Sequence, residues 1–214
     1  KIGLNGFMIN SNDLGYKLIQ DYQFDSSEIH YSVPYPHKYA TLVNEKGMTS
    51  LISLFFKSAS FSSLVVKSPR FLFTRDIKYL LSLILDLEIP KNLPKGSYVY
   101  LQNIVTDLVI GLKRPDLLEE FCKVLISKGY FPGLITLNLP KVYDMVSTFP
   151  IKLQKDLIIC FNINRTGFNV FPSKFEVEET ISRIKDKSSI QLMGMSILSS
   201  GGDLSIEDSL AYIK

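Results

Sequence analysis

Residues 156–185 read DLIICFNINRTGFNVFPSKFEVEETISRIK, and the order of elements in this stretch recurs along the chain. Residues 157–161 form a short apolar run with β-branched side chains, which is typical of a strand buried on both faces. A loop rich in Asn and Gly follows, and Ser173 and Glu176 then have the spacing of a capping box at the start of a helix. Apolar residues at helical spacing continue this helix, namely Phe175, Val177, Ile181 and Ile184. Strand, polar loop and capped helix make one βα unit.

The same unit recurs along the chain. Seven segments are predicted to be strands, at residues 2–7, 29–33, 64–67, 98–101, 134–137, 157–161 and 190–195. Helical patterns follow them, at residues 14–22, 41–57, 74–85, 117–125, 141–147, 173–185 and 205–214. This alternation indicates a parallel sheet, and no glycine-rich phosphate-binding motif follows any strand. We therefore predict one α/β domain over residues 1–214, a TIM-type (β/α)8 barrel in which seven βα units are visible.

A closed barrel of this type has eight strands. Seven visible units predict an incomplete barrel, a strand hidden in the second crossover, or further residues beyond Lys214. An open barrel edge needs cover, so we expect either such residues or self-association into a homo-oligomer.

The composition indicates a globular protein, with 46% hydrophobic and 21% charged residues. The net charge of +3 comes without a run of Lys or Arg, which argues against a nucleic-acid partner. No apolar run approaches the ~20 residues of a membrane span, and the start KIGLNGF lacks the layout of a signal peptide. We therefore predict a cytoplasmic protein with no membrane partner. Cys122 and Cys160 fall in a predicted helix and a predicted strand, so buried free thiols are expected.

Reacting groups in barrels of this type lie at the C-terminal ends of the strands. Lys67 follows three buried aliphatic residues, where desolvation would lower its pKa or a partner would hold it charged; either state suits acid–base or Schiff-base chemistry. Alternatively, its stem lies along the rim with the ammonium in water. Asn103, Asn138 and Asn162 end successive strands, where an asparagine can orient an amide or hydroxyl ligand or simply favour the turn. The two histidines and two cysteines form no metal-binding pattern.

Taken in order, these strand ends resemble the aldo-keto reductase family over nearly the whole chain. The matching segments are KIGLNGF, Tyr39 with Glu45 and Gly47, LVVK ending at Lys67, YVYLQN ending at Asn103, LITLN ending at Asn138, ICFN ending at Asn162, and MSILSSGGDLS. The last segment resembles that family's Ser-Pro-Leu-x-x-Gly loop, which contacts the cofactor pyrophosphate. Its motif positions are Ser196, Leu198 and Gly201.

The resemblance implies an oxidoreductase that uses NADP(H) or NAD(H), without a metal, to reduce a small carbonyl substrate. Tyr39 would donate the proton, Lys67 would lower the pKa of the Tyr39 hydroxyl, and Asn103 stands where the family has its histidine. Asn138 and Asn162 would face the nicotinamide carboxamide or the substrate. Pro34 stands at the family's aspartate position, so Lys67 lacks the expected carboxylate partner.

Two other functions fit the same residues. A barrel without catalysis would serve binding or assembly, with its mouth filled by its own Phe and Tyr side chains. An aldolase or isomerase would use Lys67 as a Schiff-base nucleophile or as a base.

Overall fold

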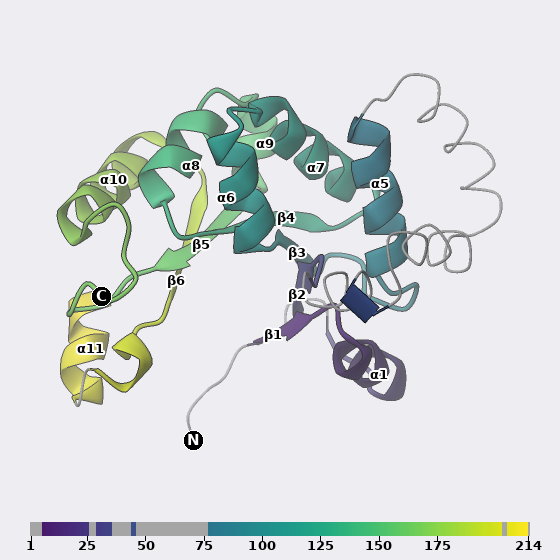
Figure 1. The fold of residues 1–214 in the computed structure, drawn as a ribbon, viewed down its shortest axis with the longest axis horizontal. Coiled ribbons are helices and arrows are strands. Elements are labelled where there is room, and N and C mark those ends of the chain that lie inside the picture. The colour runs from purple at the N-terminus through teal and green to yellow at the C-terminus, as the bar shows by residue number, and fades with distance from the viewer. Residues whose placement is uncertain (1–5, 26–28, 36–43, 46–76, 203–204, 214) are drawn as a thin grey trace. The chain divides into compact units, whose positions relative to one another are not determined.

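A computed structural model describes residues 6–25, 29–35, 44–45, 77–202 and 205–213. Its strands are β1 (Phe7–Asn10), β2 (Ile29–Val33), β3 (Tyr98–Leu101), β4 (Phe131–Thr136), β5 (Ile158–Asn162) and β6 (Gln191–Met195). Its helices are α1 (Asp13–Asp21), α5 (Ile77–Glu88), α6 (Asn103–Gly111), α7 (Pro115–Ser127), α8 (Leu139–Val146), α9 (Ile151–Lys155), α10 (Lys174–Lys187) and α11 (Ile206–Ile213), with a 3-10 turn at Ser199–Gly201. Figure 1 shows these elements along the chain.

The predicted eight-stranded TIM barrel is wrong. In the described residues the sheet has six strands, in the order β1-β2-β3-β4-β5-β6, so β1 and β6 are edge strands. The pairings of β1 with β2, of β4 with β5 and of β5 with β6 are parallel, as the βα pattern predicted. Alternating strands and helices are common to closed barrels and open parallel sheets. The lack of glycine-rich phosphate loops does not separate these two architectures.

Several predicted elements differ from the observed ones. The predicted strand at 64–67 and most of the predicted helix at 41–57 lie outside the described residues. The first described strand is Phe7–Asn10, at the end of the predicted segment 2–7 and beyond it. The pattern also missed α6 and α9. Apolar residues lie almost all around α6, so its sequence NIVTDLVIG shows no amphipathic period.

The chain divides into two compact units. The first consists of Lys1–Tyr100 and Val124–Tyr130, and the second of Leu101–Lys123 and Phe131–Lys214. None of the described helices has the length and apolarity needed to cross a lipid bilayer.

In the first unit, side-chain hydrogen bonds tie α1 and β2 to the end of α5. The fully buried Tyr31 of β2 donates its hydroxyl to the carbonyl oxygen of Glu88 at 3.1 Å. Tyr16 of α1 donates to the carbonyl oxygen of Leu87 at 2.8 Å. Burial, assisted by the charge of Glu88, raises the pKa of Tyr16 to about 12, so its hydroxyl stays a donor at neutral pH.

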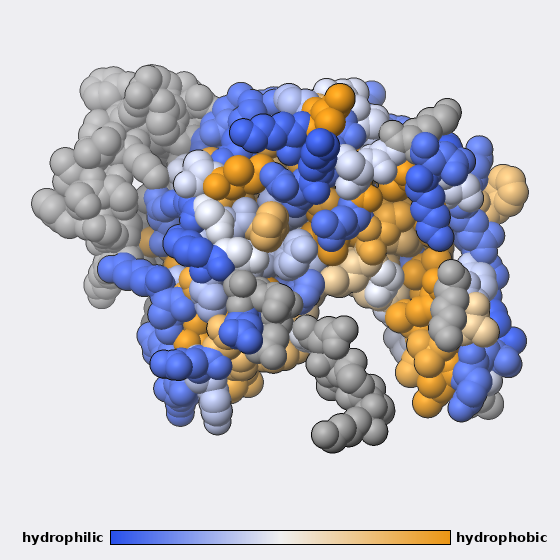
Figure 2. All heavy atoms as spheres, turned by 180° about the vertical axis from the view of Figure 1, so that it is seen from behind, coloured by the Kyte–Doolittle hydropathy of each residue, from blue (hydrophilic) through white to orange (hydrophobic). Residues whose placement is uncertain are grey.

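In the second unit, α6, α8 and α10 lie on the same side of the strands β4, β5 and β6 (Figure 1). Successive right-handed crossovers between parallel neighbours produce this one-sided arrangement. All five residues of β5 are buried, as predicted for residues 157–161, whereas no residue of β6 is fully buried. Apolar side chains gather on the surface over β6 and α11, at the lower right of Figure 2.

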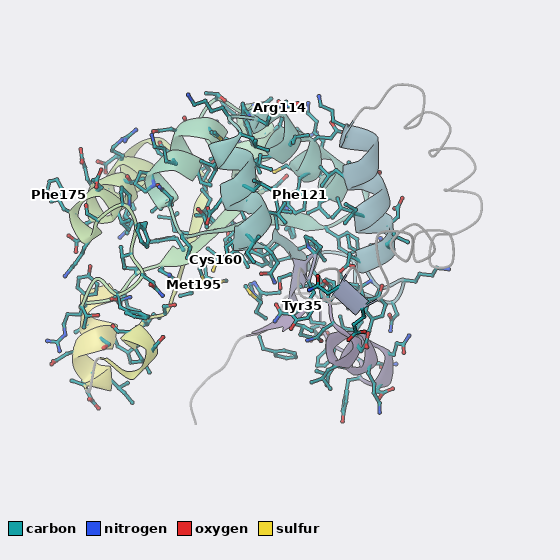
Figure 3. All side chains as sticks on the ribbon, viewed as in Figure 1. Tyr35, Arg114, Phe121, Cys160, Phe175 and Met195 are labelled. Atoms are coloured by element: carbon teal, nitrogen blue, oxygen red, sulfur yellow. The ribbon has the colours of Figure 1, made fainter. Side chains whose placement is uncertain are left out.

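Phe175 corrects the predicted apolar face of α10. Val177 and Ile184 are buried there as predicted, but Phe175 is 73% exposed and lies on the outer side of the helix (Figure 3). Phe175 is the second residue of α10, and the helical spacing alone assigned it to the buried face.

Candidate functional site

The residues predicted for a reductase site fall into two groups. Tyr39 and Lys67 lie outside the described residues, as does the contact predicted between them. The other six belong to the second unit: Asn103, Asn138, Asn162, Ser196, Leu198 and Gly201.

Asn162 and Ser196 are in direct contact where β5 and β6 end. The Ser196 hydroxyl donates to Asn162 Oδ1 at 2.9 Å, and Asn162 Nδ2 donates to the carbonyl oxygen of Asn169 at 2.9 Å. Asn162 pairs in register with Met195, the residue before Ser196, which places the two strand ends side by side. Asn162 is only 6% exposed, so its amide fixes the chain locally.

Left-handed backbone conformations are concentrated after β6. Ser196, Ser199 and Ser200 have φ values of 57°, 51° and 53°. Residues other than glycine held in this region cost of order 1–3 kcal/mol each, and they cluster at binding and catalytic sites. The Asn162 contact holds Ser196, and the Thr166 hydroxyl, which donates to Ser199 Oγ at 2.8 Å, holds Ser199.

Loop 163–173, which leaves β5, is fixed by the buried side chain of Asn164. Asn164 Oδ1 accepts from the Phe168 amide at 2.8 Å, and Asn164 Nδ2 donates to the Phe168 carbonyl oxygen at 2.8 Å. Further along the loop, Phe171 forms a parallel bridge with Asn138, which attaches the loop to the end of β4. The loop is therefore held at both strand ends.

Asp107 of α6 organises the end of β4. Its carboxylate accepts from the Thr136 hydroxyl at 2.6 Å and from the Leu137 amide at 3.1 Å. Asn138 caps α8, because its Oδ1 accepts from the Lys141 amide at 3.2 Å. The Asn138 side-chain NH2 makes no hydrogen bond to any described residue, so it is the amide donor at this edge that a ligand can use.

Sequence reasoning missed Asp107 because it missed α6. A signal was present, since Asp107 is the only charged residue in the apolar segment 104–112. A single carboxylate in such a segment indicates a buried or half-buried polar partner.

We call Asn138, Asn162, Ser196 and loop 163–173 together the β4–β6 edge. The other predicted residues lie outside this hydrogen-bonded set. Asn103 begins α6 and is half-buried, and its side chain makes no hydrogen bond to a described residue. Gly201, with a φ of 87°, donates its amide to the carbonyl oxygen of Leu198 and so closes the 3-10 turn.

Two aromatic rings are exposed on the fixed loop of the β4–β6 edge. Phe168 is 45% exposed and Phe171 is 50% exposed. An exposed ring can stack on the flat face of a ligand, while a neighbouring amide binds the polar groups at the ligand's rim. The β4–β6 edge therefore has the chemistry to bind an uncharged ring that carries hydrogen-bonding groups.

A separate aromatic cluster lies on β2 and β3 of the first unit. His30 Nδ1 lies 2.7 Å from the Tyr100 hydroxyl, and the imidazole stacks on the Tyr98 ring with centroids 5.0 Å apart. Burial lowers the pKa of His30, which keeps the imidazole neutral at pH 7. Over the described part of the chain, no three His, Cys, Asp or Glu side chains gather as a metal site would require.

Both cysteines are buried free thiols, as predicted. Burial raises the pKa of Cys122 and of Cys160 to about 12. Both thiols are therefore protonated at neutral pH and unsuited to nucleophilic catalysis.

No protein family model, curated protein or solved structure matches this chain, so the resemblance to aldo-keto reductases stays a prediction.

Proposed function

We propose that this protein binds a small ring-shaped ligand with hydrogen-bonding groups at the β4–β6 edge. The observation that carries this proposal is the exposure of Phe168 and Phe171 on a loop that the buried residues Asn162 and Asn164 hold in place. Ligand-binding residues are commonly found on loops positioned by a rigid scaffold. A loop already ordered by buried side chains loses little conformational entropy on binding.

Nicotinamide is the first candidate ring, and NAD(P)H-dependent reduction of a small carbonyl compound is the proposed activity. The support is the sequence resemblance, in which Asn138 and Asn162 face the nicotinamide carboxamide or the substrate, together with the contacts of both residues with loop 163–173. The Asn138 NH2 would donate to the carboxamide oxygen of the nicotinamide. The reduced cofactor supplies a hydride when bound, and Tyr39, assisted by Lys67, would supply the proton.

The cofactor phosphates fit the edge less well than the ring does. Glu207 and Asp208 occupy the first turn of α11, where a negative charge is already present at the helix start. Arg165 lies 3.8 Å from Asp208 and offsets part of this charge, and Glu207 still disfavours a pyrophosphate at this helix start. The proposal therefore assigns the ring, and not the phosphates, to the β4–β6 edge.

The test compares two edge variants with a matched control. Phe171→Ala removes an exposed ring from the edge, and Phe175→Ala removes an equally large exposed ring from α10, outside it. Asn138→Asp keeps the oxygen that caps α8 but removes the NH2 donor. NADPH, NADH and uncharged monosaccharides are titrated into each protein. Binding of NADPH and NADH is measured by the cofactor fluorescence, and binding of every probe by the shift in the melting temperature of the protein.

We expect Phe171→Ala to weaken binding of the best probe about tenfold and Asn138→Asp about fivefold, with Phe175→Ala within twofold of the wild type. Equal affinity in all four proteins would refute the assignment of the edge. Binding of monosaccharides without NADPH or NADH would refute the reductase candidate alone.

Binding without catalysis is the second candidate. It is favoured by Pro34, which follows β2 at the position where the reductase pattern has its aspartate. Consumption of NADPH in the presence of small aldehydes separates the two functions. A protein that binds the cofactor and leaves it unoxidised with every aldehyde is a binding protein.

A further inference from the structure

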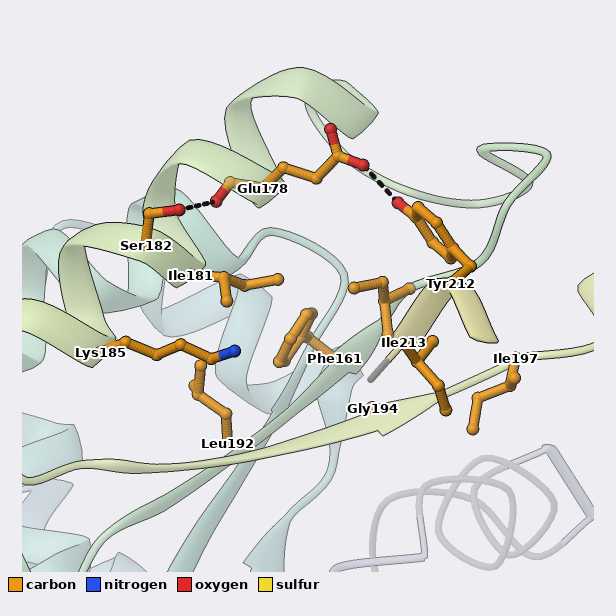
Figure 4. A pocket seen from close by; sticks show the side chains of 11 residues that line it. Phe161, Glu178, Ile181, Ser182, Lys185, Leu192, Gly194, Ile197, Tyr212 and Ile213 are labelled. Carbon is orange, nitrogen blue, oxygen red and sulfur yellow. Dashed lines mark hydrogen bonds between the residues drawn. The ribbon is translucent and has the colours of Figure 1, made fainter. Parts of the chain in front are cut away.

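A second site lies in the second unit, in a hollow bounded by α10, β6 and α11 (Figure 4). Its volume is about 410 Å³, which lies within the range of about 300–1,000 Å³ usual for small-molecule pockets. Much of its lining is apolar: Phe161, Ile163, Ile181, Leu192, Ile197 and Ile213. Ile163 is also the first residue of loop 163–173, and the other five residues lie outside the β4–β6 edge.

Gly194, the fourth residue of β6, lets the side chain of Ile163 pack closely against the strand. A Cβ atom at this position would lie 2.7 Å from the Cγ2 atom of Ile163, so even an alanine would push that side chain aside. β6 is also one of the two edge strands of the described sheet, and its residues are half-buried or exposed. The apolar lining therefore faces an opening.

The two charged groups of the hollow differ in their partners. Glu178 accepts a hydrogen bond from the Tyr212 hydroxyl at 2.5 Å and lies 3.9 Å from the ammonium of Lys174. Lys185 takes part in none of the ion pairs between described residues. In Figure 4 its nitrogen lies over Leu192 and points toward the ring of Phe161. The hollow thus combines an apolar wall with one cation that no described carboxylate neutralises.

We propose that this hollow binds an aliphatic carboxylate. The carboxylate accepts a hydrogen bond from Lys185 Nζ, and the chain lies along Phe161, Ile181, Leu192 and Ile213. An anionic head is favoured because Lys185, although exposed, pairs with no described carboxylate, and a carboxylate accepts a charge-assisted hydrogen bond from its ammonium. Glu178, already bonded to Tyr212 and close to Lys174, excludes a second anion from the far end.

The test is a calorimetric titration of the full chain with decanoate, hexanoate and decanol. Decanoate should bind saturably, and hexanoate at least tenfold more weakly, because four fewer methylene groups contact the apolar wall. Lys185→Gln should weaken decanoate about tenfold and leave decanol unchanged. Lys152→Gln, which removes an exposed lysine of α9 that does not line the hollow, is the control and should change neither.

Ser182→Leu supplies an independent variant that fills the hollow. Ser182 is exposed on α10 and lines the hollow, so a leucine there is compatible with the helix and occupies the space of the ligand. Decanoate binding should be lost while the circular dichroism spectrum is unchanged. Binding that is indifferent to both Lys185→Gln and Ser182→Leu would overturn the proposal. The proposal would also be overturned if the wild-type protein were a dimer that binds no decanoate and Ser182→Leu were a monomer. The hollow would then be an interface between two copies of the chain.

Discussion

Asn162→Ala removes the buried amide that joins the end of β5 to both β6 and loop 163–173. The wild-type side chain makes two hydrogen bonds of 2.9 Å, one with the Ser196 hydroxyl and one with the carbonyl oxygen of Asn169. A hydrogen bond contributes about 1 kcal/mol net, and a buried group left without its partner costs about 1–3 kcal/mol. The variant should therefore lower the free energy of unfolding by about 2–3 kcal/mol.

The contact with Ser196 can be isolated by a double-mutant cycle. Ser196→Ala alone should cost about 1 kcal/mol, and the double variant should cost about 1 kcal/mol less than the sum of the two single variants. Asn103→Ala is the matched control. It also removes an asparagine of the second unit, at the start of α6, but one whose side chain has no hydrogen bond to a described residue, so it should change stability by less than about 0.5 kcal/mol.

The assay is urea unfolding followed by circular dichroism at 222 nm, because the chain has no Trp to report by fluorescence. For a chain of this length each kcal/mol lowers the melting temperature by about 2–4 °C, so Asn162→Ala should melt roughly 4–12 °C below the wild type. A loss no larger than that of Asn103→Ala would refute the view that Asn162 holds the β4–β6 edge. A zero coupling with Ser196 would refute the contact itself.

Three further predictions test the packing. Gly15→Ala should destabilise the protein by more than about 2 kcal/mol, because the new Cβ would lie 2.1 Å from the carbonyl oxygen at the end of β1. Gly111→Ala is the control: no atom lies within 4 Å of its new Cβ, so its free energy of unfolding should be unchanged or rise by up to about 1 kcal/mol. Thermal melts of the two variants test this. Burial raises the thiol pKa of Cys122 and Cys160 to about 12, so neither thiol should react with a thiol reagent at pH 8 in the folded protein. Both should react once the protein is unfolded in urea. Rapid labelling without denaturant would contradict their burial. Ser173→Ala should cost about 1 kcal/mol in urea unfolding and Ser173→Gly only a few tenths, because glycine is itself a tolerated N-cap; equal losses would argue against the cap.

Local chemistry made several elements predictable. The N-cap half of the predicted capping box is confirmed, since Ser173 Oγ accepts from the Glu176 amide at 3.2 Å. The Glu176 carboxylate accepts from the Ser173 hydroxyl at 2.7 Å, where the box would have it accept from the Ser173 backbone amide. β2 and β3 have the predicted bounds, because runs of β-branched and aromatic residues end there at a proline and at a polar pair. These features depend on neighbours within a few residues.

Features that depend on distant residues were not predictable in the same way. Whether a run of βα units closes into a barrel depends on the pairing of its first and last strands, and the βα pattern of single units carries no information on that pairing. Asn162 illustrates the same limit at the site. Its spacing allowed a ligand contact or a turn, and only the fold shows that its amide bonds to Ser196, 34 residues further along the chain.

If the β4–β6 edge is a ligand site, nitrogen-15 NMR of its side-chain amide groups will detect the ligand there. NADPH and uncharged monosaccharides are titrated into the labelled protein. We expect one of these probes to shift the Asn138 NH2 signal and the backbone signals of Phe168 and Phe171. The NH2 signal of Asn162, which is already hydrogen-bonded to the Asn169 carbonyl oxygen, should move little. Shifts confined to other parts of the chain, or no shift at millimolar concentrations of every probe, would contradict a ligand site at the β4–β6 edge.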